Sequence, residues 1–540
     1  MTRAPGGQAG AAAAGWRGRP AALATLCTLL FLTFCDNTAV SVALASIRSD
    51  LHAGVSALQW VVGAYVLTFA ALMLTFGMVG DEFGRKKVML AGAGVYCAGA
   101  ALSALAGSAG VLIAGRAVMG LGAAASEPGT LSMIRQLYPD ERRRNRALGV
   151  WAAVSGFSLA LGPVLGGALV GAWSWRGIFW FDVTFGLAAL AAAAVVLPES
   201  ADPRAGRVDV SGTVLGAAAL GALVFAVIDG ETAGFAAPLV LAMFAVSGLA
   251  AAGFAVRETR AAHPLLDPRY LRVARFTVPN IVAACCYFAT FAIFIFTALY
   301  LAEVDGYGGY RIAAVFAPMT AVMIGASLLA GRLTSAVGIR WSLAGGCVVF
   351  AAGLLATSAA LSAPTGYLRL AAALALAGAG LGCCVVPLTS SVLAAVPGDR
   401  SGLAASATNT SREVGAVAGV IALGALVNAR LIGALTVRMT QLQLPAAVQK
   451  AIIGVVQSGG GGALALSGGT AGTGGSGRGL IGELLQAGYA GFAAALHDAL
   501  TISACLLAAG AVLAAVALRG RDGGLTGPLP EPVRAPRRRG

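Results

Sequence analysis

Long apolar stretches alternate with short polar segments along almost the whole chain. An α-helix needs about 20 apolar residues to cross the hydrocarbon layer of a bilayer. Fourteen stretches meet this requirement and predict an all-α polytopic membrane protein. They lie near residues 21–46, 57–79, 88–106, 110–134, 147–170, 177–197, 211–229, 236–256, 276–301, 312–330, 341–361, 368–393, 413–436 and 493–518.

The polar segments between these stretches differ in positive charge. Placing the loop at residues 77–87 inside the cell puts most of the 37 Lys and Arg residues in inner segments. Cytoplasmic loops are the ones that retain Lys and Arg. An even number of spans then places both termini on the same side. We therefore expect a multi-pass protein of the cytoplasmic membrane with both termini in the cytoplasm.

A weak internal repeat indicates two related halves, as in many transporters. Gly77, Gly84 and Arg85 recur as Gly331, Gly338 and Arg340, and each half later has a Gly-Leu-Gly segment followed by proline. Six spans match six, and two spans remain between the halves. The predicted organisation is a cytoplasmic tail (1–20), a six-helix half (21–197), a two-helix insert with cytoplasmic connectors (198–275), a second six-helix half (276–518) with a long outside loop (437–490), and a disordered cytoplasmic tail (519–540).

Composition supports the membrane assignment and excludes other classes. The chain is 58% hydrophobic and 11% charged, with a mean hydropathy of +0.82, which is too apolar for a soluble domain. The net charge of +14 could indicate nucleic-acid binding, but that needs a basic face on a soluble domain. These charges fall in short loops instead. We expect the lipid bilayer as partner, no nucleic acid, and a monomer.

Signatures of enzymes and metal sites are missing from the sequence. It has no phosphate-binding loop, no His-Glu-x-x-His and no Gly-x-Ser-x-Gly. The nine cysteines lie in or beside apolar stretches without Cys-x-x-Cys spacing, so we interpret them as small buried hydrophobes. The sequence therefore predicts neither an enzyme nor a metal site, and any transport work must draw on an ion gradient.

Ionisable residues inside spans are costly and mark functional sites. Asp36 in the first span and Arg116 in the fourth lie within about one helical turn in depth, so we expect them to pair. The pair could bind and release a proton, or it could only fix helix packing. Glu127 could carry a proton, attract a cationic substrate, or bond backbone freed by Pro128. Asp182 and Glu413 are expected near the membrane interfaces.

Several motifs resemble those of the major facilitator superfamily. The loop Gly-x-x-x-Asp-x-x-Gly-Arg-Lys-Lys at 77–87 is similar to its signature loop. Arg116-x-x-x-Gly120-x-Gly122 is similar to a second motif, and 158–167 to a motif of antiporters with Ser in place of the first Gly. The two extra central spans resemble those of its fourteen-span drug:proton antiporters. This resemblance implies a major facilitator fold with two six-helix halves and two extra central helices.

The resemblance also assigns roles to residues. It links Arg116 to proton coupling, and we add Asp36 as its expected partner and Glu127 as a second embedded acid. We expect the signature loop to act as a conformational latch. Small residues in span five would form a hinge or seal, or only pack closely. The first span resembles the family's Asp-x-Thr segment at residues 36–38, but it has Ser41 where Asn is usual and Ala45 where Pro is usual. The conformational residues are Gly77, Asp81, Gly84, Arg85, Gly162, Pro163, Gly166 and Gly167.

Substrate contacts are expected from aromatic residues. The resemblance points to Trp60 and Tyr65 in span two. In span nine, Tyr287, Phe291 and Phe294 share one helical face, which suits flat or lipophilic cations but also fits a face turned to lipid or core.

The functional expectation is export of small lipophilic compounds, such as drugs and antibiotics, in exchange for protons, with no cofactor beyond the proton gradient. Two alternatives stay open. One is proton-coupled export or import of a specific metabolite. The other is a membrane sensor or scaffold that transports nothing.

Overall fold

The computed structural model describes residues 19–199, 209–260, 270–361, 367–396, 401–457 and 475–518, and every regular element in this part is a helix. Residues 1–18, the segments 200–208, 261–269, 362–366, 397–400 and 458–474, and the tail 519–540 lie outside the described residues. The first half contains α1 (Arg19–Leu51), α2 (Val55–Phe83), α3 (Arg85–Ala104), α4 (Ala109–Leu137), α5 (Glu141–Ala172) and α6 (Arg176–Val196). The pair α7 (Val210–Ala233) and α8 (Pro238–Arg260) follows. The second half contains η1 (Tyr270–Arg272), α9 (Ala274–Phe291), the π-helix η2 (Ala292–Phe296), α10 (Thr297–Glu303), α11 (Gly309–Leu361), α12 (Tyr367–Ala394), α13 (Ser401–Gln441), α14 (Ala446–Gln457) and α16 (Gly475–Ala517).

The helices account for the predicted spans. Within the described residues, 12 helices are long and apolar enough to cross a membrane, or 13 if the bent α5 counts as one span. α11 has 53 residues, and a straight helix of that length would measure about 80 Å, far more than the roughly 30 Å of hydrocarbon. Gly338 interrupts it with φ 83°, between the two spans predicted there. Fourteen spans are reached when α11 counts as two, and that count stays a prediction.

Two glycine turns occur at positions that the internal repeat predicts to be equivalent. Gly84 separates α2 from α3 with φ 110°, and Gly338 divides α11 with φ 83°. Positive φ favours glycine because it has no Cβ. The two predicted equivalents therefore make the same sharp reversal between the second and third spans of their halves.

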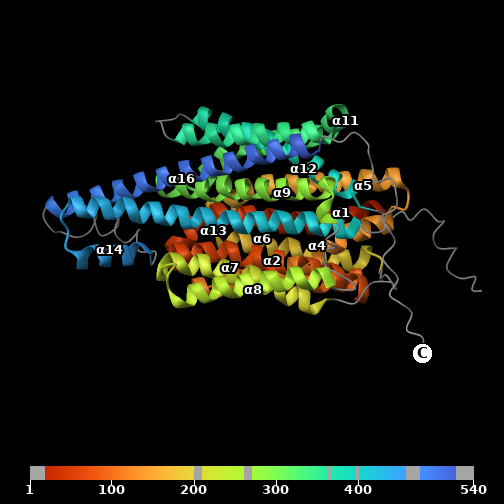
Figure 1. Ribbon diagram of the computed structural model, residues 1–540, viewed down its shortest axis with the longest axis horizontal. Helices are drawn as coiled ribbons and strands as arrows, with labels where there is room; N and C mark the ends of the chain where they lie inside the picture. The colour runs from red at the N-terminus through yellow and green to blue at the C-terminus, as the bar shows by residue number, and fades with distance from the viewer. Residues whose placement is uncertain are drawn as a thin grey trace, which may run out of the picture.

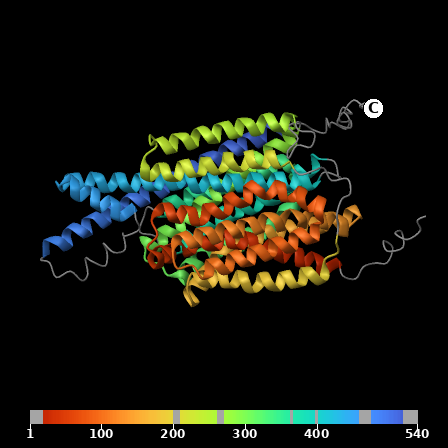
Figure 2. The same cartoon turned by 90° about the horizontal axis from the view of Figure 1, so that it is seen from below.

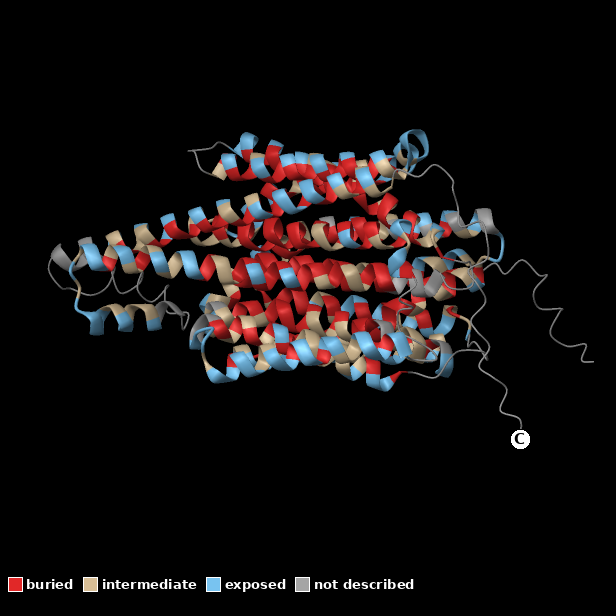
Figure 3. Ribbon diagram, in the orientation of Figure 1, coloured by how far each residue is buried: buried red, intermediate tan, exposed pale blue. Residues whose placement is uncertain are grey.

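The helices run alongside one another in an elongated bundle (Figure 1). The α7–α8 pair packs on its side through contacts of α7 with α2 and α13, and α8 is mostly exposed. α1 and α9 are mostly buried in the interior (Figure 3). The apolar outer faces suit contact with lipid, and the buried helices are the ones that carry the candidate site.

Helices extend into both ends of the segment 437–490, which was predicted as an outside loop. α13 runs to Gln441, α14 follows, and α16 begins at Gly475, so this part projects beyond the other helices (Figures 1 and 2). Leu435, Met439 and Leu484 form a small apolar core there, and Arg438 pairs with Glu483 at 2.9 Å. These contacts let the helices extend. Residues 458–474 lie outside the described residues.

Candidate functional site

Asp36 of α1 and Arg116 of α4 form an ion pair in the interior of the first half. Arg116 Nη1 lies 2.5 Å from Asp36 Oδ2, and both side chains are fully buried. A buried pair compensates two charges that would each be costly alone. The structure confirms the predicted contact, while its role in proton coupling stays a prediction.

Arg116 is held by further groups that do not involve the acid. Its Nε donates to the Val61 carbonyl at 3.0 Å, and its guanidinium lies 4.4 Å from the centroid of the Tyr65 ring. Tyr65 in turn donates its hydroxyl to the Thr33 carbonyl at 3.0 Å. The arginine can therefore keep its position if the acid changes its charge. Tyr65, predicted as a substrate contact, is fully buried in this cluster.

A second acid shares this site. Asp182 of α6 lies beside Asp36 and Tyr96, and it is 2% exposed. The expectation of an interfacial position was therefore wrong. Asp182 is only six residues from the start of α6 at Arg176, which made it look superficial, but α6 packs against α1 and covers it. Two carboxyls thus face one arginine in the first half.

A bend in α5 is joined directly to the helix that carries Asp36. Pro163 has no N–H, so the carbonyl of Leu159 loses its helical partner. Thr38 donates its hydroxyl to that carbonyl at 2.9 Å. The segments Gly149–Leu159 and Leu161–Ala172 meet at 42°. The predicted bend is therefore present, and a side chain two residues after Asp36 fills the freed position.

Glycines let α5 approach its neighbours closely. A Cβ on Gly162 would collide with Thr38 and the Cys35 carbonyl, and one on Gly166 would collide with the Ala39 backbone. A Cβ on Gly167 would lie 2.6 Å from the Gly309 carbonyl of α11. α5 therefore packs against α1 on one side and against the second half on the other.

A second polar cluster joins the two halves. Asn409 of α13 donates to Glu127 of α4 at 2.6 Å, and Arg412 donates to Asn409 at 3.3 Å and to Thr389 of α12 at 2.8 Å. Glu127, Asn409 and Arg412 are all at most 3% exposed. Motion of one half against the other must break or rearrange the Glu127–Asn409 hydrogen bond.

Glu413 belongs to this cluster, and its expected interfacial position was wrong. It is fully buried close to Glu127 and Asn37, and neither of its oxygens has a hydrogen bond of standard geometry within the described chain. The prediction placed it at the start of a span, but α13 begins at Ser401, twelve residues earlier. Here too, two carboxyls face one arginine.

The aromatic residues predicted to contact substrate lie in different surroundings. Trp60 is half-buried, and its ring centroid lies 6.5 Å from that of Phe225 on α7. Tyr287 lies under Arg412, with 5.5 Å from guanidinium to ring centroid. Phe291 and Phe294 are 2% and 1% exposed. The span-nine residues therefore face the protein interior rather than lipid.

A cavity of about 60 Å³ lies between the halves, lined by residues of α1, α2, η2, α10, α13 and α16 that include Gln59 and Asn428. Sites for drug-sized ligands usually measure roughly 300 to 1,000 Å³. This cavity is therefore smaller than a typical site for a drug-sized ligand.

The signature loop is tied to the end of α6. The Lys86 N–H donates to Glu199 at 3.2 Å, and the Lys86 ammonium donates to the Ala194 carbonyl at 2.7 Å. A Cβ on Gly84 would lie 2.9 Å from the same Glu199 carboxylate. Gly77 lies within α2 and Arg85 begins α3, while the side chain of Asp81 lies outside the described residues.

Sequence reasoning missed Asp182, Arg412, Glu413 and Asn409 as site members. Their spacing carries no motif, because they come from α6 and α13 and meet the other members only through tertiary packing. The one available signal was that each pair of acids needs a basic partner in an apolar bundle.

Comparisons with known proteins agree with this architecture. A model of the Major Facilitator Superfamily matches residues 26–420. The chain is 31% identical over 402 residues to the multidrug resistance protein Stp of Mycobacterium tuberculosis strain CDC 1551 / Oshkosh, covering 74% of each chain. It is 33% identical over 397 residues to the methylenomycin A resistance protein of Bacillus subtilis strain 168, covering 73% of this chain and 84% of the relative.

Two further matches support the same assignment. The tetracenomycin C resistance and export protein of Streptomyces glaucescens is 31% identical over 429 residues, covering 79% of each chain. Among solved structures, a bacterial homologue of the human lysosomal transporter Spinster, inward-facing and unoccupied, aligns with a TM-score of 0.62 and 18% identity over 92% of this chain and 98% of that chain. That structural likeness shows the fold alone. On the family match and these relatives, the chain belongs to the major facilitator superfamily and is a multi-pass membrane transporter.

Proposed function

We propose that this transporter exports small lipophilic compounds across the cytoplasmic membrane in exchange for protons, and that Asp36 is the group that binds the proton. The named relatives, which are multidrug and antibiotic resistance proteins, support the substrate class and the direction. The positive inner loops support cytoplasmic termini. The transporter works as a monomer and uses no cofactor beyond the proton gradient.

The observation that carries the proposal is the buried ion pair of Asp36 and Arg116 with Asp182 beside it. With both acids ionised, one negative charge is left uncompensated in an apolar interior, and that is costly. A single added proton balances the three groups. The cluster is thus suited to alternate between two charge states.

Protonation of Asp36 weakens its attraction to Arg116. Hydrogen bonds between two charged groups are roughly twice as strong as neutral ones, and a neutral carboxyl gives up that advantage. Arg116 keeps its bond to Val61 and its contact with Tyr65. The change therefore acts on α1 rather than on α4.

The contacts of α1 provide a route to the second half. Thr38 connects α1 to the bend of α5, and α5 meets α11 where Gly167 and Gly309 touch. A shift of α1 can therefore alter the contact between the halves. The Glu127–Asn409 bond is the polar contact that such a movement must break.

The energy of one proton is sufficient for useful export. Moving one charge through about 100 mV supplies roughly 2.3 kcal/mol. Since about 1.4 kcal/mol corresponds to a tenfold ratio, one proton can sustain more than a tenfold concentration difference of an uncharged compound.

Transport in everted membrane vesicles tests the proposal. The vesicles are given an acidic interior, and uptake is followed for a panel of fluorescent lipophilic cations that includes ethidium. We expect the wild type to accumulate at least one of them and Asp36→Asn to fall to the level of vesicles without the protein.

The matched control is Asp50→Asn. Asp50 is an exposed acid at the end of the same helix, and its carboxylate lies 2.6 Å from Arg176 Nη1. This variant should transport like the wild type when present in equal amount. Full gradient-driven transport by Asp36→Asn would refute Asp36 as the proton site. Movement of the compound only out of the everted vesicles, which corresponds to import into the cell, would refute export.

A further inference from the structure

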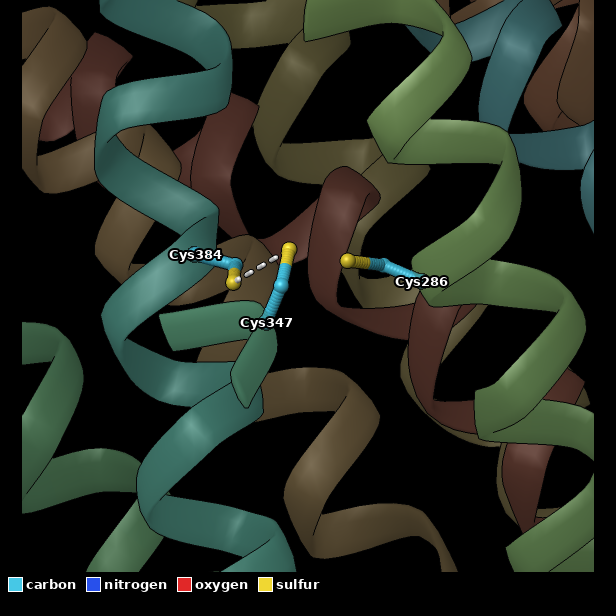
Figure 4. Close-up of side chains that lie close together, drawn as sticks. All are labelled: Cys286, Cys347 and Cys384. Atoms are coloured by element: carbon cyan, nitrogen blue, oxygen red, sulfur yellow. Dashed lines mark hydrogen bonds between the residues drawn. The ribbon is translucent and has the colours of Figure 1, made fainter. Parts of the chain in front are cut away.

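Three cysteines that are far apart in the sequence meet in the interior of the second half. Cys286 of α9, Cys347 of α11 and Cys384 of α12 are fully buried, and their sulfurs lie within 4.8 Å of one another. The sulfurs of Cys347 and Cys384 are 3.8 Å apart. Figure 4 shows the three sulfurs turned toward one another, with that of Cys347 between the other two.

Tight helix packing sets this arrangement. A Cβ on Gly346 would lie 2.7 Å from the Cys384 sulfur, and one on Gly380 would collide with the backbone of Phe350. α11 and α12 can therefore approach closely enough for their thiols to face each other. The packing holds three reduced thiols at one point without a disulfide.

The distances suit a single central atom. Zn–S bonds measure about 2.3 Å, and three sulfurs bound to one atom at that bond length lie at most about 4 Å apart. The Cys347–Cys384 separation already matches this value. The remaining separations, at most 4.8 Å, need to close by less than about 1 Å.

The groups around the three cysteine sulfurs limit which atom they can bind. In the described chain, the ionisable groups that lie close to these sulfurs are cysteines, with Cys285 as the additional one, and the phenol of Tyr287 beside Cys286. No described His, Asp or Glu joins the three as a fourth ligand. Three thiolates around a monovalent or divalent metal would leave a net negative charge in an apolar core, which is unfavourable. Structural zinc also needs four ligands.

We propose that Cys286, Cys347 and Cys384 form a binding site for a trivalent thiophilic metalloid of the arsenite class, held as a neutral tris-thiolate. Arsenous acid, As(OH)₃, reacts with three thiols to give As(SR)₃ and three waters. Three As–O bonds break, three As–S bonds form, and each thiol proton leaves in water. No electron is transferred and no net charge appears, so the product suits this interior.

Binding there would join three helices of the second half. Cys286 directly precedes Tyr287, whose ring lies under Arg412 of the polar cluster between the halves. A tris-thiolate would fix α9 against α11 and α12 beside that cluster. The site would thus make the transporter a target of thiophilic metalloids, whatever its own substrate.

Arsenite titration of the purified, reduced protein in detergent tests the site without reference to transport. We expect one arsenic per chain by elemental mass spectrometry, with three As–S and no As–O contacts in the arsenic X-ray absorption spectrum. Because the third thiol adds a large effective concentration, Cys286→Ala, Cys347→Ala and Cys384→Ala should each weaken binding by at least about 100-fold. Cys27→Ala and Cys505→Ala serve as controls and should bind like the wild type.

A second measurement needs no variant. After arsenite treatment of the wild type, maleimide labelling under denaturing conditions followed by peptide mass spectrometry should show protection of Cys286, Cys347 and Cys384 and labelling of the other cysteines. Protection of a different set, retained As–O contacts, or unchanged affinity in a monodisperse Cys347→Ala variant would overturn the proposal. Tighter binding of Zn²⁺ or Cu⁺ than of arsenite would overturn the choice of a metalloid.

Discussion

The Thr38 hydroxyl is the group through which α1 reaches the bend of α5. It donates to the Leu159 carbonyl at 2.9 Å, and Pro163 leaves that carbonyl without a helical partner. A valine has nearly the same shape but cannot donate. Thr38 thus packs between α1 and α5 and supplies the hydrogen bond that the Leu159 carbonyl lacks because of Pro163.

Thr38→Val should destabilise the protein by about 1–3 kcal/mol, because it leaves a buried acceptor unpaired. Thermal unfolding in detergent measures the effect. The control is Thr28→Val, since Thr28 bonds only to Ala24 of its own helix. Equal melting temperatures for the two variants would contradict the assigned role of Thr38.

For single residues, the sequence predicted the depth of a side chain along its helix but not its burial by neighbouring helices. Asp36 and Arg116 could be matched because both are deep in long spans, and depth can be counted along a helix. Counting depth along a helix did not predict the burial of Asp182 and Glu413. Each lies near a predicted span end, and other helices cover it. Burial by neighbouring helices is not encoded in the local pattern.

At the scale of elements, one acid fixes the start of α7 and joins it to α8. Asp209 accepts from the Gly212 N–H at 3.0 Å and from Ser211 at 2.7 Å, and it pairs with Arg257 of α8 at 3.2 Å. Burial of Asp209 raises the pKa of its carboxyl, but the hydrogen bonds from Gly212, Ser211 and Arg257 outweigh this and lower the pKa overall. The carboxylate form therefore stabilises the α7–α8 pair.

Asp209→Ala should cost about 1 kcal/mol through loss of the helix cap, and Asp209→Asn should cost less, because Asn is also a good cap. A lowered pKa gives stability that is present above the ordinary value of about 3.9 and is lost as the pH falls through the folded-state value. The melting difference between wild type and Asp209→Ala should thus shrink in that acidic range. A difference that grows as the pH falls would contradict the assignment.

Helix bounds were predictable where apolar stretches and glycine turns coincide, as at Gly84 and Gly338. The end of α13 and the start of α16 were not, because these helices continue outside the expected spans as a pair. Leu435, Met439 and Leu484 stabilise each other there only once both helices are in place. A Gly-rich segment between them obscured this pairing.

At the scale of the whole molecule, the Glu127–Asn409 hydrogen bond connects the two halves at 2.6 Å. The sequence could assign six spans to each half from the repeat, but not this contact, because it depends on how the halves face each other. Glu127 was predicted as an embedded acid, whereas its partner belongs to no motif.

Asn409→Ala should shift the balance of access states, because the lost contact is worth about 1–3 kcal/mol, or roughly a 5- to 150-fold change in ratio. Hydrogen exchange of α4 and α13 should become faster. Asn280→Ala is the control, since Asn280 donates within its own helix to Phe276. Unchanged exchange in Asn409→Ala would show that the contact does not hold this state.

A proton on Asp36 is expected to change how the two halves are arranged. The most direct measurement is the distance between spin labels at positions 83 and 335, two exposed sites next to the equivalent glycine turns. The labels are carried on non-natural amino acids because the chain has nine cysteines. We expect Asp36→Asn, whose side chain is neutral like a protonated carboxyl, to show a distance distribution shifted from that of the wild type in the same buffer. A distribution identical to that of the wild type would contradict the proposed role of Asp36.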